Sequence, residues 1–208
     1  SGLGLAELLL AQGRALDAAD ACRRLSELLS DDETVLTRLA EACMAVPDYG
    51  RAVEAFERLV ALRDDKAWRA DKLHGMAKLY RDKLNDNEQA IVTLEKGIEQ
   101  IPTSMQMLGD LRELLIDAGR KSELEPRLEA AKDELRRRVG ADPLDADAYV
   151  DLSRAAEWSE DEYTLLATLG VLTCLERADE QERELYARRV AKTEEAGFAP
   201  RASSANAW

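Results

Sequence analysis

Apolar residues in the segment 76–102 follow two helical stripes separated by a polar turn. The first stripe places Met76, Tyr80 and Leu84 four residues apart, which is the spacing of one helix face. Residues 85–87, Asn-Asp-Asn, compete for their own backbone through side-chain hydrogen bonds, so they end this helix. The second stripe consists of Ala90, Ile91, Leu94, Gly97, Ile98 and Ile101. The pattern therefore predicts a helix, a turn and a second helix.

The ends of the second helix are also marked in the sequence. Asp86 and Gln89 have the spacing of a helix N-cap and its partner, and Pro102 cannot donate the next backbone hydrogen bond. Two helices of this length cannot bury their apolar stripes against each other alone. We therefore expect further helix pairs to be stacked on both sides of this one.

This segment resembles a tetratricopeptide repeat, a helix pair of 34 residues. The family's small and aromatic positions in the first helix, its small–bulky–small series in the second helix and its closing proline fall on Ala77, Tyr80, Ala90, Leu94, Gly97 and Pro102. The resemblance implies an all-α, right-handed superhelix whose first helices line a concave groove that binds proteins or peptides. Similar units are common in long bacterial tandem-repeat proteins.

The same pattern recurs along the chain. Ala18 and Ala52 correspond to Ala90, and Leu124 follows Ala90 by the family interval. The interval from Ala52 to Ala90 is longer by four residues, which predicts one additional helical turn in the third unit. We expect a repeat domain at residues 1–197, with units at about 1–30, 31–65, 66–102, 103–142 and 143–178, a capping helix at 180–196 and a flexible tail at 198–208.

Several helix starts are predicted from capping boxes. In a capping box, the side chains of a serine and of a glutamate three residues later each accept a hydrogen bond from the other residue's backbone amide. The candidates are Ser30–Glu33, Ser122–Glu125 and Ser159–Glu162, together with Thr103 or Ser104 as a simple N-cap. Pro126 fits a helix only because it falls in the first turn.

Charge is distributed unevenly over the chain, whose net charge is −13. Residues 1–60 carry 6 basic and 11 acidic side chains, residues 61–140 carry 16 of each, and residues 141–208 carry 7 and 15. The acidic ends repel phosphate backbones, so we expect no nucleic-acid partner and favour a basic protein or peptide. No apolar run is long enough for a membrane helix, and residues 1–12 indicate a truncated repeat helix, not a signal peptide.

Candidate chemistry is sparse. His74 is the only histidine, no glycine-rich phosphate loop is present, and the cysteines lack metal-ligand spacing. We therefore expect no catalytic residue, no metal and no cofactor. Cys22, Cys43 and Cys174 are interpreted as buried, reduced thiols, which favours the cytoplasm, and a bridge between the first two is the less favoured alternative.

Projecting the repeat pattern onto the first helices gives the residues expected to line the groove: Thr37, Glu41, His74, Lys78, Arg81, Asp110, Glu113, Asp117, Arg154 and Glu157. The set lacks the lysine, asparagine and arginine combination with which some family members hold an acidic chaperone terminus. The favoured hypothesis is a non-catalytic scaffold that binds a partner in this groove. The alternatives are a helical positioning arm of a larger enzyme or secretion complex, and self-association through the repeat ends.

Overall fold

The computed structural model describes residues 2–29 and 31–195, and every regular element in these ranges is helical. The prediction of an all-α fold is confirmed for this part of the chain. The molecule divides into two compact units, residues 1–121 and 122–208. This boundary lies inside the fourth predicted repeat, so the two helices of that repeat belong to different units. The predicted tail at 198–208 lies outside the described residues.

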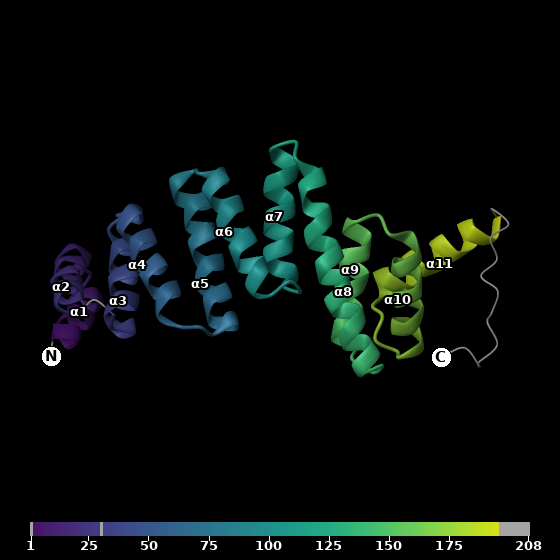
Figure 1. The fold of residues 1–208 in the computed structure, drawn as a ribbon, viewed down its shortest axis with the longest axis horizontal. Helices are drawn as coiled ribbons and strands as arrows, with labels where there is room; N and C mark the ends of the chain where they lie inside the picture. Colours follow the sequence, from purple (N-terminus) through teal and green to yellow (C-terminus); the bar gives the residue numbers. More distant parts are fainter. Residues whose placement is uncertain (1, 30, 196–208) are drawn as a thin grey trace. The chain divides into compact units, whose positions relative to one another are not determined.

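The first unit is a row of helices in which each one packs against the next (Figure 1). Its elements are α1 (Gly2–Ala11), α2 (Ala15–Leu28), α3 (Glu33–Ala45), α4 (Tyr49–Leu62), α5 (Lys66–Leu79), η1 (Tyr80–Leu84), α6 (Asn87–Gln100) and α7 (Met105–Asp117). The turn between α1 and α2 contains Gly13 at a φ of +73°, a conformation that glycine adopts without a steric penalty. Short turns of this kind make consecutive helices antiparallel neighbours.

The apolar stripes predicted from the sequence form the core of this unit. Leu94 and Ile98 of α6 are buried together with Leu73 and Met76 of α5. Gly97 faces α7, where a Cβ atom would lie 2.7 Å from the Met107 sulfur. The small residue at this position therefore lets the methionine pack directly against the α6 backbone.

The additional turn predicted in the third unit is present, but in an unexpected conformation. Residues 80–84 form a π-helical turn, η1, at the end of α5. The Asp86 amide donates to the Tyr80 carbonyl at 2.9 Å, and Asn85 has a left-handed φ of +51°. Asparagine tolerates this conformation better than most residues, so it can end the wide turn. The sequence indicated the extra length and not the widened hydrogen-bond pattern.

Within residues 122–195, which the structure describes, the second unit contains four α-helices. These are α8 (Glu125–Ala141), α9 (Ala146–Trp158), α10 (Glu162–Cys174) and α11 (Glu180–Glu195), and the 3₁₀ turn η2 (Lys121–Leu124) lies at the boundary between the units. Leu165, Leu169 and Leu172 of α10 form the centre of its apolar core. Leu185 and Tyr186 pack against this core from α11. The last described helix therefore covers apolar surface of α10.

Two of the predicted caps are confirmed. Asp86 accepts a hydrogen bond from the Gln89 amide at 3.0 Å, and Ser104 accepts one from the Met107 amide at 3.5 Å. Pro126 lies in the first turn of α8, as its missing amide requires.

Other predicted caps are wrong. Asp32 caps α3 by accepting from the Val35 amide, and Asp161 caps α10 by accepting from the Thr164 amide. The predicted serines, Ser30 and Ser159, each precede the observed cap by two residues, and Ser30 lies outside the described residues. The Ser122 box is replaced by the turn η2, and α8 begins without a side-chain cap. Aspartate competes well with serine at this position because an ionised carboxylate also interacts favourably with the helix dipole.

Candidate functional site

Three predicted groove residues of the first unit meet in one polar cluster. The His74 Nε2 atom of α5 lies 2.6 Å from the Asp110 Oδ2 atom of α7. Arg81 donates from Nη1 to the other oxygen of the same carboxylate at 3.2 Å. Only 12% of the His74 side chain and 20% of the Asp110 side chain are exposed. The cluster therefore links the first helices of two consecutive repeats.

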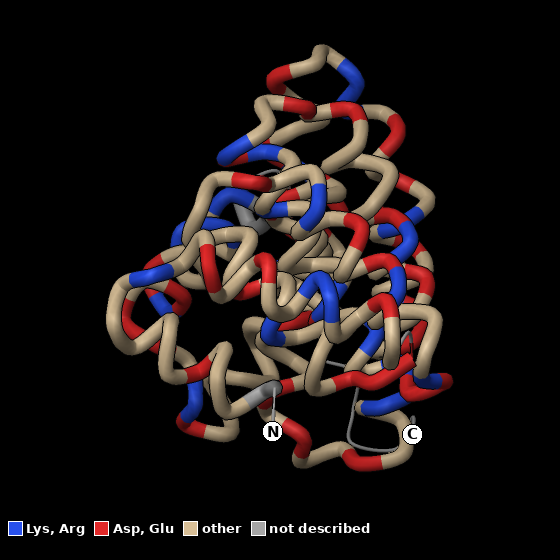
Figure 2. Tube along the Cα trace, turned by 90° about the vertical axis from the view of Figure 1, so that its left-hand side faces the viewer, with Lys and Arg blue, Asp and Glu red and all other residues tan. Residues whose placement is uncertain are grey.

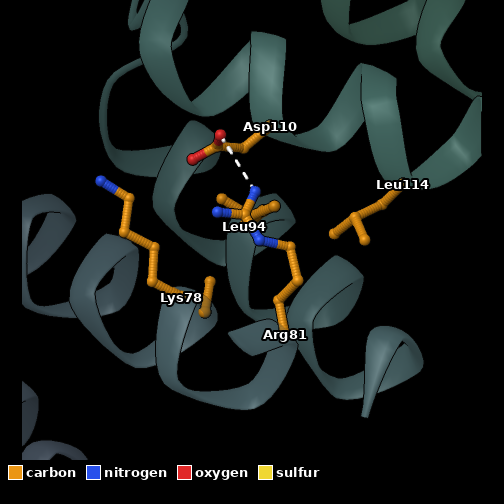
Figure 3. A pocket seen from close by; sticks show the side chains of 6 residues that line it. Lys78, Arg81, Leu94, Asp110 and Leu114 are labelled. Atoms are coloured by element: carbon orange, nitrogen blue, oxygen red, sulfur yellow. Dashed lines mark hydrogen bonds and ion pairs between the residues drawn. The ribbon is translucent and has the colours of Figure 1, made fainter. Parts of the chain in front are cut away.

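Arg81 reaches Asp110 from the π-helical turn η1, as Figure 3 shows. Lys78 lies to one side of this pair and Leu114 to the other, with Leu94 behind them. These side chains fill the hollow so closely that no space remains for a water molecule. The surface at this point is consequently a set of fixed charges over an apolar base, and not an open cavity.

Thr37 and Glu41 both lie on α3, and each forms a side-chain hydrogen bond within that helix. The Thr37 hydroxyl donates to the Glu33 carbonyl at 2.8 Å, and Glu41 accepts from Arg38 at 2.8 Å. Arg38 also donates to Glu7 of α1 at 2.9 Å. Arg38 was not among the predicted groove residues, although it forms an ion pair that joins α1 to α3.

Glu113 and Asp117 follow Asp110 along one side of α7, and both are exposed. Their spacing of three and four residues places their carboxylates on the same helix face as Asp110. Since Asp110 is paired with Arg81 and His74, these two residues provide the accessible negative charge of this face.

In the second unit, Arg154 and Glu157 of α9 line a hollow of about 270 Å³. Leu165 and Leu169 form its base, and Leu185 closes one side from α11. The rim also contains three polar residues at the start of α11: Asp179, Gln181 and Glu182. The hollow thus combines an apolar base with one basic and three acidic rim residues. The ten predicted groove residues therefore fall into two groups, one in each unit.

Charges elsewhere are mixed: Figure 2 shows acidic and basic positions interleaved along the helices. Many are close ion pairs, such as Arg63 with Glu33 at 2.9 Å and Arg120 with Glu88 at 2.9 Å. Among residues 2–29 and 31–195, no three histidine, cysteine or acidic side chains are grouped as ligands for a metal ion. Within the same ranges, none of the helices has both the length and the apolarity required to cross a bilayer.

Cys22 and Cys43 are buried free thiols in one core, but Cys174 is exposed, which corrects the prediction for this residue. Cys174 is the last residue of α10, where the helix end leaves its side chain uncovered. Burial raises the pKa of Cys22, and burial together with the charge of Asp48 raises the pKa of Cys43 to about 11. Both thiols are therefore held in the unreactive protonated form at neutral pH.

This difference predicts selective labelling. Iodoacetamide at neutral pH should alkylate Cys174 in the folded protein and reach Cys22 and Cys43 only after denaturation, as measured by peptide mass spectrometry. The fully denatured protein is the control, in which all three thiols should react. Equal labelling of the three thiols in the folded protein would contradict the placement of the first two in the core.

One buried polar cluster was missed altogether. Only 2% of the Lys132 side chain is exposed, and its ammonium group lies 2.5 Å from Glu129 and 3.2 Å from Asp161. The group also donates to the Ser159 hydroxyl at 2.9 Å. A signal was present in the sequence, because Lys132 stands between Leu128 and Leu135 on the apolar stripe of α8. A cation in that position requires partners from a neighbouring element.

The chain is similar to solved tetratricopeptide-repeat proteins. One is YrrB, described as a TPR protein with an unusual peptide-binding site, at 17% identity over 90% of each chain with a TM-score of 0.45. Another is the C-terminal part of a TPR repeat-containing protein from Cytophaga hutchinsonii, at 14% identity over 95% of this chain and 74% of that chain with a TM-score of 0.49.

The protein MamA is also similar, at 14% identity over 88% of this chain and 96% of that chain with a TM-score of 0.46. No family model matches the sequence, and no curated protein matches it either. The tetratricopeptide-like description therefore rests on the chain's own helix pairs and on the small and bulky residues that pack them.

Proposed function

We propose that the protein is a non-catalytic scaffold that binds a segment of a partner protein through side chains of its first helices. The observation that carries this proposal is the 270 Å³ hollow at Arg154 and Glu157. Residues selected from the repeat pattern alone lie there at the rim of an open space with an apolar base. An apolar base supplies affinity for a side chain, and rim charges select its neighbours.

The charges of this hollow favour a basic partner. Glu157, Asp179 and Glu182 contribute three carboxylates, against one guanidinium from Arg154. The Asp179 carboxylate accepts a hydrogen bond from the Glu182 amide at 2.8 Å, and the Glu182 carboxylate accepts one from the Asp179 amide at 2.9 Å. These bonds fix both carboxylates at the start of α11. A lysine or arginine next to an apolar side chain is the partner sequence that complements this arrangement.

A library of random twelve-residue peptides displayed on phage tests this proposal with the full chain. One class of the enriched peptides should contain a basic residue beside a bulky apolar one. Glu157→Lys, at an exposed position, should weaken the binding of these peptides about tenfold in fluorescence anisotropy, which corresponds to about 1.4 kcal/mol.

The matched control is Glu184→Lys, which makes the same charge change at an exposed position of α11 outside the hollow. Its effect should be less than about twofold, because exposed charges contribute little at a distance. If both variants weaken binding equally, the effect is one of net charge and the hollow is not the binding site.

The acidic face of α7 gives a separate prediction. Some selected basic peptides should bind the first unit. Replacing Glu113 and Asp117 together by lysine should lower the affinity for these peptides about tenfold. Thermal melting followed by circular dichroism should be unchanged, because both side chains are exposed. Unchanged affinity for every selected basic peptide would remove the α7 face from the binding surface.

A further inference from the structure

A larger pocket lies elsewhere in the second unit, with a volume of about 720 Å³. Its walls come from three helices and the loop between α8 and α9, and most of its lining is apolar: Val139, Gly140, Pro143, Tyr149, Leu152, Tyr163, Ala167 and Val171. The remaining lining residues are Arg136, Thr164 and Thr168. A pocket of this size accommodates more than one apolar side chain.

This pocket is separate from the hollow at Arg154 and Glu157. Tyr149 and Leu152 of α9 line this pocket, whereas Val150, Ser153, Arg154 and Glu157 line the hollow from a different side of the same helix. No lining residue is common to both. The two sites can therefore be altered independently.

Two exposed apolar side chains lie at or next to the lining of the pocket. Tyr163 is 85% exposed and Leu144 is 74% exposed, and among the described residues of the second unit these are the exposed large hydrophobic side chains. Tyr163 lines the pocket, and Leu144 is adjacent to its lining residue Pro143. A small ligand inside the pocket would leave Leu144 and most of Tyr163 uncovered. The apolar surface thus fits an occupant that extends beyond the pocket, such as a polypeptide segment.

Arg136 is the charged side chain among the described lining residues, and its charge is balanced by the carboxylates of Asp133 and Asp161 that contact it. Its guanidinium donates to Asp133 at 3.1 Å, to the Thr164 hydroxyl at 3.1 Å and to Asp161 at 3.4 Å. These bonds fix its orientation, while 43% of the side chain remains exposed. These bonds involve Nη1 and Nη2, so the Nε–H group remains to donate to a carboxylate of an occupant.

We propose that this pocket is a second docking site, which binds a partner segment containing bulky apolar side chains next to an acidic residue. The apolar side chains fill the space between α8 and α10 and cover Tyr163. The acidic side chain pairs with Arg136. The charge preference is opposite to that proposed for the hollow at Glu157, so the two sites would select different sequences.

The test uses the same kind of phage library on the full chain, followed by anisotropy with the enriched peptides. A class of peptides with an aromatic or branched apolar residue beside aspartate or glutamate should emerge. Ala167→Trp places a bulky side chain in the pocket from an exposed position. It should lower the affinity for this class of peptides at least about tenfold. Arg136→Gln should lower the affinity for these peptides by a similar factor, whereas Arg136→Lys should retain part of it.

Ala187→Trp, an equal substitution at an exposed position of α11, is the matched control and should bind like the wild type. Melting curves identify any variant that does not fold, and Ala167→Trp is chosen because its side chain is already exposed. Acidic apolar peptides that bind Ala167→Trp as well as the wild type would overturn the proposal. So would the absence of this peptide class, or tighter binding of decanoate than of any selected peptide. None of these results bears on the basic peptides of the other site.

Discussion

Leu94→Ala should lower the free energy of unfolding by about 3 kcal/mol. Leu94 is 1% exposed in the middle of α6, and it forms the base under the cluster of Arg81 and Asp110 (Figure 3). Truncation removes buried methyl groups and leaves a cavity among helices that are fixed by their own packing. Urea denaturation followed by circular dichroism measures the loss as a lower midpoint.

Val92→Ala is the matched control, because this valine lies on the same helix and is 40% exposed. Its effect should be within about 0.5 kcal/mol, since little apolar surface is lost and alanine has the higher helix propensity. Equal midpoints for the two variants would show that Leu94 does not lie in the core. In that case the stripe from Ile91 to Ile98 would be assigned to the wrong face of α6.

Helix positions and core faces could be predicted from the sequence because they depend on local spacing. Ala77, Ala90 and Gly97 are small where consecutive helices approach closely, and all three are buried or lie against a neighbour. Leu94 is large where the space between helices must be filled. A period of three to four residues is sufficient to place such side chains on a helix face.

The polar contacts could not be predicted in the same way, because they join residues that are distant in the chain. His74 and Asp110 are 36 positions apart, and Lys132 and Asp161 are 29 positions apart. The repeat pattern placed His74 and Asp110 on first helices, but it does not specify that their side chains meet. The helix cap at Asp161 was also missed, because Ser159 satisfies the same local pattern. Selection among such candidates depends on the tertiary partners.

Arg81 illustrates the limit in another way. The interval between repeats indicated four additional residues, yet the direction of the Arg81 side chain depends on the π-helical form of η1. A regular α-helical turn would rotate the residues that follow by a different angle. The contact with Asp110 is therefore a consequence of backbone geometry that apolar spacing does not encode.

Asp161→Ala should also destabilise the protein by about 3 kcal/mol, through two losses at one residue. The Asp161 Oδ1 atom accepts from the Thr164 amide at 3.1 Å and caps α10. Its Oδ2 atom accepts from the Thr164 hydroxyl at 2.7 Å and from Lys132 at 3.2 Å. Alanine removes the cap and leaves the buried ammonium of Lys132 with one carboxylate fewer.

Asp161→Asn separates the two contributions, because asparagine is also a good N-cap but carries no charge. It should cost less than Asp161→Ala, and the difference between the two, measured by urea denaturation, gives the value of the cap. If the two variants lose equal stability, the cap contributes nothing and the whole effect belongs to the charge cluster.

The same cluster predicts how stability varies with pH. Burial acts to raise the pKa of Asp161, but the hydrogen bonds from Thr164 and the interaction with Lys132 outweigh it and leave that pKa below its ordinary value. Its contribution is therefore complete at neutral pH and is lost in acid, below about pH 4. Burial acts to lower the pKa of Lys132, but Glu129 and Asp161 outweigh it and leave that pKa raised. The lysine's contribution is therefore lost in base, above about pH 10.

Comparing the wild type with Asp161→Asn across pH isolates this carboxylate. The stability difference between them should be constant near neutrality and should shrink as the pH falls below about 4, where the wild-type carboxylate takes up a proton. A difference that persists unchanged at pH 2.5 would mean that the aspartate is not held ionised by its neighbours. The amide would then be destabilising because of its shape and hydrogen bonding, and Lys132 would depend on Glu129 alone.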